Sequence, residues 1–215
     1  MVKLPALKLV RFNEDRHLPK TAEEKLNDDF FILLTAYIGE RSGLKVNRLN
    51  LQKTIFLTKL ALHEKGIKFF NTSFCRHLYG PYQKRVHFST QRLTKYSLIE
   101  KEEIVGNDIV LTNEGVNFLN FVLEKLPENE AFKSYFETTK GFLEEYSGDR
   151  AGRSIDQTHK MKVRTSKGIR RVEDLTTDEN YYLEPEIDVS YKASVEAPQE
   201  AIANLANYRE YSLQA

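Results

Sequence analysis

The side chains of this sequence that we consider first for chemistry are its one cysteine, its five histidines and the adjacent glutamates Glu102-Glu103 and Glu144-Glu145. Cys75 and His77 are only two residues apart and the other histidines are scattered, so no spacing typical of a metal site occurs. We therefore predict that Cys75 is a small buried hydrophobic residue. Glu102-Glu103 and Glu144-Glu145 are pairs of the kind that usually lie on solvated faces.

No motif of a known enzymatic mechanism occurs in the sequence. A glycine-rich phosphate loop, a nucleophile elbow and a His-Glu-x-x-His helix are all absent from it. We therefore expect a protein that is not an enzyme and that uses neither a cofactor nor a metal ion.

We next consider binding to another macromolecule. One segment carries a cluster of hydrogen-bond donors that such binding would use. Residues 83–96 have helical periodicity, with Val86, Leu93 and Tyr96 on one side and mostly polar side chains around the other. Ammonium, guanidinium and amide groups donate the hydrogen bonds that phosphates and guanine edges accept. The donors here are Lys84, Arg85, Gln91, Arg92 and Lys95. A solvated basic face that binds nothing is an equally good interpretation of the same pattern.

The stretch Leu78-Tyr79-Gly80-Pro81-Tyr82 lies just before this helix and must turn the chain. Gly80 is free to take positive φ, while Pro81 fixes its own φ and disfavours helical geometry in the residue before it. We expect Gly80 and Pro81 to fix how the helix begins and Tyr79 to be partly buried against the preceding helix. Tyr82, Lys84 and Arg85 are then the exposed candidates for contact.

Capping residues and apolar spacing predict the helices before this turn. Thr21, with Glu24 three residues later, forms a capping-box pattern before a helix over about 22–41. Asn47 is placed to cap a second helix, whose broad apolar face ends at Gly66.

Two short strands and a further helix are predicted after the basic segment. Residues 98–104 and 109–111 read as strands joined across Gly106-Asn107-Asp108, and Thr112 then caps a helix that Pro127 closes. Helix, helix, helix, hairpin, helix is the order of a winged-helix domain. The predicted fold class is therefore mainly α with a small β-hairpin (α+β), a winged-helix-like core plus a C-terminal extension.

The predicted domain organisation has three parts: an N-terminal arm over 1–20, a winged-helix-like domain over 21–147 and a charged C-terminal extension over 148–215. The net charge of +1 conceals a strong asymmetry in that extension. Residues 150–171 contain eight basic residues and one acid, and residues 173–215 contain ten acids and two basic residues. These blocks could neutralise each other in the fold or serve separate partners.

Composition limits the cellular setting. A single cysteine fits a reducing compartment, and no run approaches the ~20 apolar residues of a membrane span. The N-terminal residues lack the apolar stretch of a signal peptide. We expect a cytoplasmic protein with no membrane partner.

Several short motifs together carry a family resemblance, which covers about residues 28–126. They are Phe31-Ile32-Leu33 with Tyr37-Ile38, Leu49-Asn50-Leu51-Gln52-Lys53 leading into Ile55-Phe56-Leu57, and Tyr79-Gly80-Pro81. This order resembles the Panacea domain, also called the SocA-like antitoxin domain. The chain departs from the family pattern at His77, where a tryptophan is usual, and at Tyr82, where a small aliphatic residue is usual.

The resemblance implies an antitoxin that neutralises a cognate toxin, encoded nearby, by direct protein–protein binding. The family motif residues, Leu51, Gln52, Lys53, Tyr79, Gly80 and Pro81, are expected to be structural. The expected partner-binding residues are Tyr82, Lys84, Arg85 and Arg92. The oligomeric state is left open.

The alternative function is that of a winged-helix DNA-binding transcriptional regulator, which could also be autoregulatory. Its nucleic-acid contacts would be Lys84, Arg85, Gln91, Arg92 and Lys95. The predicted wing is acidic, with Glu100, Glu102, Glu103 and Asp108 against Lys101, and phosphates would repel it.

Overall fold

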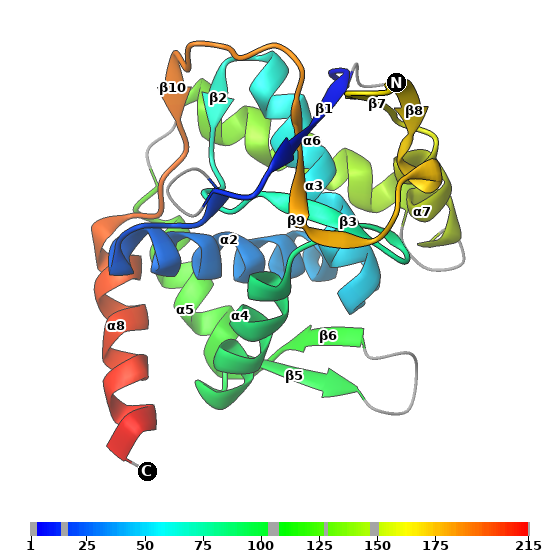
Figure 1. Ribbon diagram of the computed structural model, residues 1–215. Helices are drawn as coiled ribbons and strands as arrows, with labels where there is room; N and C mark the ends of the chain where they lie inside the picture. Colours follow the sequence, from blue (N-terminus) through cyan, green and yellow to red (C-terminus); the bar gives the residue numbers. More distant parts are fainter. Residues whose placement is uncertain (1–3, 14–16, 103–107, 127–128, 147–150, 215) are drawn as a thin grey trace.

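The computed structural model describes the chain except residues 1–3, 14–16, 103–107, 127–128, 147–150 and 215 (Figure 1). Two long helices, α2 (Ala22–Arg41) and α3 (Arg48–Glu64), form its centre and are buried over most of their lengths. Apolar residues occupy nearly every side of both helices, so other elements must cover them all round. Both therefore belong to the core rather than to the surface.

The capping residues predicted for these two helices are confirmed. The Thr21 hydroxyl accepts a hydrogen bond from the Glu24 amide at 3.0 Å, and the Glu24 carboxylate accepts one from the Thr21 amide at 3.3 Å. Asn47 caps α3 in the same reciprocal way with Asn50. These local contacts fix where each helix begins, which is why sequence alone predicted the boundaries.

A six-stranded sheet covers this helical centre, in the order β4-β3-β9-β1-β7-β8. Strand β1 pairs in parallel with β7, and the other neighbours in the sheet are antiparallel. The strands are β1 (Leu7–Arg11), β3 (Phe74–His77), β4 (Gly80–Tyr82), β7 (Lys162–Thr165), β8 (Gly168–Arg171) and β9 (Asp178–Pro185). The predicted class, mainly α with a small β-hairpin around a winged-helix-like core, is therefore wrong. The protein is an α+β protein with a mixed sheet.

Long-range pairing explains why the sheet was not predicted. The central strand β9 pairs with β1, about 175 residues earlier, and with β3 in the middle of the chain. Five of the six strands have five residues or fewer, too short for a clear alternating pattern. The sheet draws strands from the predicted arm, from the predicted central domain and from the predicted extension (Figure 1).

The elements after the Tyr-Gly-Pro turn follow the predicted order. Helix α4 (Lys84–Lys95) leads into a two-stranded hairpin of β5 (Ile99–Glu102) and β6 (Asp108–Leu111). The Thr112 hydroxyl then caps α5 (Asn113–Leu123) by accepting from the Gly115 amide at 3.0 Å, as predicted. Gly106 and Asn107 of the predicted turn and the closing Pro127 lie outside the described residues.

The remaining elements complete the two sides of the core. Helix α6 (Glu130–Tyr146) packs against α3, and α8 (Gln199–Gln214) packs against α2. Helix α7 (Ala151–His159) contacts both α3 and β4, and a 3₁₀ turn (Val172–Asp174) follows β8. Strands β2 (Ile67–Lys68) and β10 (Ala193–Ser194) form a separate parallel pair. None of the helices in the described ranges is both long and apolar enough to cross a membrane.

The charged blocks of the C-terminal region make some contacts with each other. Arg164 of β7 forms an ion pair with Glu186, and Arg171 pairs with Glu173 at 3.1 Å. Lys162, Lys167 and Arg170 are exposed on the same hairpin. Mutual neutralisation therefore accounts for part of the charge asymmetry only.

Candidate partner-binding site

Helix α3 holds the start of α4 through the side chain of Gln52. Its amide nitrogen donates to the Gln83 carbonyl and its amide oxygen accepts from the Gln83 amide, both at 3.0 Å. Gln52 thus satisfies both backbone groups of Gln83, as a neighbouring strand would. The Gln83 side chain accepts from the Arg85 amide at 3.1 Å and so caps α4.

Lys53, the next residue of α3, holds the strand before α4. Its Nζ donates to the Pro81 carbonyl at 2.6 Å, and the side chain is almost completely buried. Burial, reinforced by the positive charge of Arg76, lowers the pKa of Lys53 to about 7. Burying an amine costs free energy. The position of Lys53 beneath the turn therefore indicates either a ligand-binding or a structural role.

Gly80 fits its place for two reasons. Its φ is +89°, a conformation that side-chain-bearing residues rarely adopt. A Cβ there would also lie 2.9 Å from Thr158 Oγ1 and 3.1 Å from a ring carbon of His159. The glycine therefore allows α7 to pack directly on the turn.

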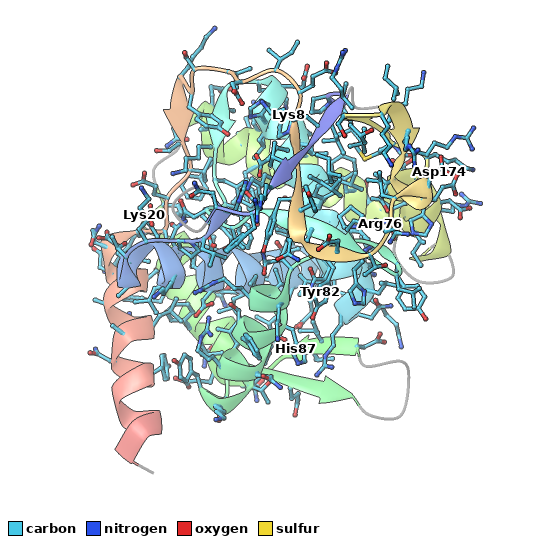
Figure 2. All side chains as sticks on the ribbon, in the orientation of Figure 1. Lys8, Lys20, Arg76, Tyr82, His87 and Asp174 are labelled. Atoms are coloured by element: carbon cyan, nitrogen blue, oxygen red, sulfur yellow. The ribbon has the colours of Figure 1, made fainter. Side chains whose placement is uncertain are left out.

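The turn exposes its tip. Leu78 and Tyr79 are 61% and 55% exposed, so Tyr79 is not partly buried against α3 as the sequence suggested. Tyr82 is half-buried, and its ring lies 4.7 Å from that of His77. Figure 2 shows Tyr82 and His87 on the neighbouring elements β4 and α4. Leu51 and Pro81 are buried.

Helix α4 presents an exposed face of mixed character. Lys84, Gln91 and Lys95 are exposed on it, and Phe88 between them is 43% exposed. The Lys84 ammonium lies 5.8 Å from the centre of the Phe88 ring, a cation–π arrangement. This face therefore combines positive charge with an aromatic ring.

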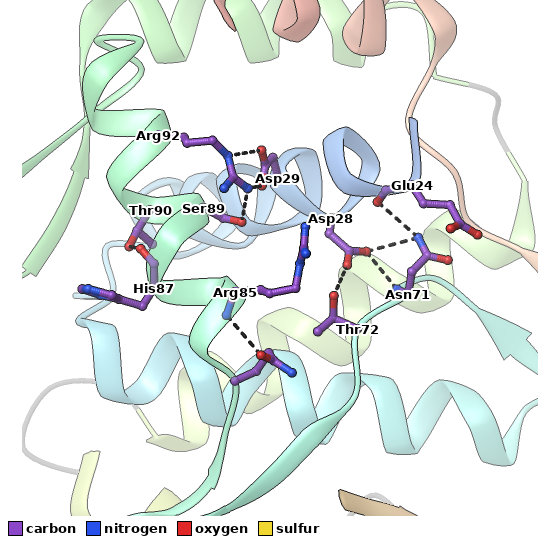
Figure 3. A network of polar contacts seen from close by, with 11 residues as sticks. Glu24, Asp28, Asp29, Asn71, Thr72, Arg85, His87, Ser89, Thr90 and Arg92 are labelled. Carbon is purple, nitrogen blue, oxygen red and sulfur yellow. Dashed lines mark hydrogen bonds and ion pairs between the residues drawn. The ribbon is translucent and has the colours of Figure 1, made fainter. Parts of the chain in front are cut away.

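Two of the predicted contact residues point inward instead. Arg92 forms a bidentate ion pair with the buried Asp29 of α2, at 2.7 and 3.1 Å, and also donates to Ser89 at 2.9 Å. Arg85 is half-buried, and Figure 3 shows its guanidinium directed toward α2. Arg92 is therefore a structural residue of the α2–α4 contact.

A buried polar network next to this ion pair escaped the sequence analysis (Figure 3). Asp28 accepts from the Asn71 amide at 2.8 Å and from the Thr72 hydroxyl at 2.5 Å. Lys59 of α3 donates to the Thr72 carbonyl at 2.8 Å. The two adjacent aspartates inside an otherwise apolar stretch of α2 were the signal that could have revealed it.

The stability of the protein should depend on pH through Asp28. Burial raises the pKa of its carboxyl to about 6, above its ordinary 3.8, because the charged form is disfavoured there. Between pH 4 and 6 the folded state therefore binds more protons than the unfolded state, and the contribution of Asp28 to stability falls as pH rises. We take the free energy of unfolding of wild type minus that of Asp28→Asn, both measured by urea unfolding. We expect this difference to fall by up to about 3 kcal/mol from pH 4 to 7.

The Asp28→Asn comparison removes the contribution of other titrating groups, which both proteins share. Asparagine keeps the shape of the side chain and can still accept from Asn71. A stability difference that does not change with pH would show that Asp28 titrates normally.

A pocket of about 340 Å³ opens where α3, the β3–β4 turn and α4 meet. Tyr79 and His87 line its sides, and Lys53 and Arg48 of α3 also line it. The Nε of Arg48 is buried and has no hydrogen-bond partner among the described residues. The volume is in the range of small ligand sites.

Three basic residues that the sequence did not single out, Arg48, Arg76 and His159, lie around the motif residues. Arg76 Nη1 and His159 Nε2 are buried and, within the described part of the chain, have no hydrogen-bond partner. The ranges that the structure describes contain no group of three or more histidine, cysteine or acidic side chains that could hold a metal ion. The buried surroundings of the turn thus contain several basic side chains with unused hydrogen-bonding atoms.

Comparison with known proteins finds no match to this chain among family models, curated proteins or solved structures. The likeness to the Panacea domain therefore stays a prediction, carried by the motif residues around Lys53 and Gly80.

Proposed function

We propose that this protein is antitoxin-like and neutralises a toxin, encoded nearby, by direct protein–protein binding. The binding surface is formed by Leu78, Tyr79, Lys84 and Phe88, which we call the hairpin surface. The observation that supports it best is an exposed apolar tip on a rigidly held turn.

Adjacent apolar side chains that are exposed to solvent commonly mark an interaction site. Leu78 and Tyr79 are more than half exposed, while Lys53 and Gln52 hold the backbone at Pro81 and Gln83, just before α4. Interfaces are enriched in aromatic residues and in positions that lose little entropy on binding. A rigid tip with a tyrosine, followed by a phenylalanine on the exposed face of α4, has both properties.

The same surface suits a protein better than a nucleic acid. Arg92, a donor expected to contact phosphate, is already paired with Asp29. Phe88 occupies the middle of the exposed α4 face, where a groove-binding helix would place polar contacts. Glu100, at the start of the neighbouring hairpin, is exposed and negative.

Removing the aromatic groups of the hairpin surface should abolish neutralisation. We expect the double substitution Tyr79→Ser/Phe88→Ser to weaken binding to the neighbouring gene product by about thirtyfold or more, the loss typical of removing central aromatic contacts. Co-expression of each variant with that gene product, scored as cell growth, measures neutralisation. Titration calorimetry with the purified pair measures affinity.

Phe121→Ser provides a matched control. Phe121 is 46% exposed on α5, and Lys125 lies 4.2 Å from its ring centre, so its setting resembles that of Phe88. We expect this variant to neutralise like wild type. Growth rescue by Tyr79→Ser/Phe88→Ser equal to that of wild type would contradict the proposed surface, and harmless neighbouring gene products would contradict the antitoxin function.

A further inference from the structure

The pocket beside the hairpin surface is lined by basic side chains and by no acid. Lys53 and Arg48 both line it, and none of its twelve lining residues is an aspartate or glutamate. Lys53 has three N–H donors in its charged form, and Pro81 is the one acceptor that its Nζ reaches among the described residues. The buried Nε of Arg48 likewise lacks an acceptor in this part of the chain.

Buried donors without acceptors favour a ligand that supplies them. A charged amine that stays buried costs free energy unless an anion or several acceptors surround it. A carboxylate can accept from both Lys53 and Arg48, since each of its oxygens has two lone pairs. The donors therefore select an anion over a neutral group.

The rest of the pocket selects an apolar group next to that anion. Leu49, Leu51 and Val86 provide aliphatic wall, and the rings of Tyr79 and Tyr82 also line it. A pocket of about 340 Å³ accommodates roughly one amino-acid side chain with part of its neighbour. An inorganic ion would leave most of this apolar surface uncovered.

We propose that this pocket binds a carboxylate side chain of the partner protein, an Asp or Glu that is adjacent to an apolar residue. The inference rests on the proposed function, because Tyr79 belongs both to the hairpin surface and to the pocket lining. A partner seated on Tyr79 lies beside the pocket, and an acidic side chain at that position would reach Lys53 and Arg48. Tight interfaces place such anchors in pockets near their centre.

The probe for this site is 3-phenylpropionate, which combines a carboxylate with an apolar ring, and its neutral control is 3-phenylpropanamide. We expect the acid to shift the backbone NMR signals of the lining residues Leu49, Leu51 and Val86, and to bind at least tenfold more tightly than the amide. Arg48→Gln should weaken the acid about tenfold and leave the amide unchanged. Lys53→Met should do the same, provided that its unfolding curve shows a folded protein.

Lys95→Gln is the matched control, because Lys95 is an exposed cation on α4 outside the pocket lining. It should leave binding of the acid unchanged. Equal affinity for acid and amide, shifts confined to other surfaces, or an Arg48→Gln variant that binds the acid like wild type would each overturn the carboxylate site. If neutralisation still depends on Tyr79 and Phe88 in that case, the proposed function stands and only the acidic anchor is lost.

Discussion

Replacing Gly80 with valine is expected to destabilise the protein by about 3–5 kcal/mol and to abolish partner binding. Valine cannot adopt a φ of +89° without strain, and its Cβ would meet Thr158 at 2.9 Å. Relief of that contact requires the turn to move away from α7 or the Thr158 side chain to give up its position. The turn also determines where α4 begins, four residues after Gly80, so the hairpin surface would be displaced.

Gly168→Val separates the two causes. Gly168 has a φ of +105°, yet a Cβ there has nothing within 4 Å. Valine at this position therefore carries backbone strain of about 1–3 kcal/mol without a clash. Urea unfolding of both variants measures the difference, which reports the packing of α7 on the turn. Equal losses for the two variants, or an unchanged neutralising activity in Gly80→Val, would show that this packing is unimportant.

Replacing Arg92 with methionine is expected to cost about 3 kcal/mol of stability. The carboxylate of Asp29 is almost fully buried, and loss of Arg92 leaves its charge unpaired. This cost is at the lower end of the range for breaking a buried ion pair. A third of the Arg92 side chain is exposed, so water can reach this side of the pair. Chemical denaturation of the purified variant measures the loss.

The double variant Asp29→Asn/Arg92→Met should recover most of that loss, because no buried charge then remains. Lys95→Met, an exposed cation of the same helix, is the control and should change stability little. If Arg92 instead contacts a partner or a phosphate directly, Arg92→Met will keep wild-type stability and lose only binding. The two results separate the structural role from the role predicted for it by sequence.

The other basic residues of α4 also differ in how far a partner can reach them. Lys84 and Lys95 remain exposed and can contact a partner, whereas Arg85 is half-buried and Arg92 is paired. Helical spacing places these residues within the first and last turns of α4 but cannot show which side α2 covers. A list of basic residues on a helix therefore overstates the charge that a partner meets.

Sequence alone determined the local features of this protein. Thr21, Asn47 and Thr112 each bind the backbone within three residues of themselves, so their types and spacing already specify the beginnings of α2, α3 and α5. A turn within the stretch from Leu78 to Tyr82 was predicted for the same reason, since the φ preferences of Gly80 and Pro81 are intrinsic. The structure turns at Leu78 and Tyr79, and Gly80 and Pro81 begin β4.

The tertiary structure decided everything that depends on contacts distant in sequence. The six-stranded sheet joins β1 to β7 and β9, and the pairing of strands so far apart leaves no local pattern to read. Gln52 and Lys53 were recognised as motif residues, yet their hydrogen bonds to Gln83 and Pro81 cross about 30 residues. The pocket around Lys53 exists only because α3, the turn and α4 meet there, and burial, which no spacing encodes, gives its amine an unusual pKa.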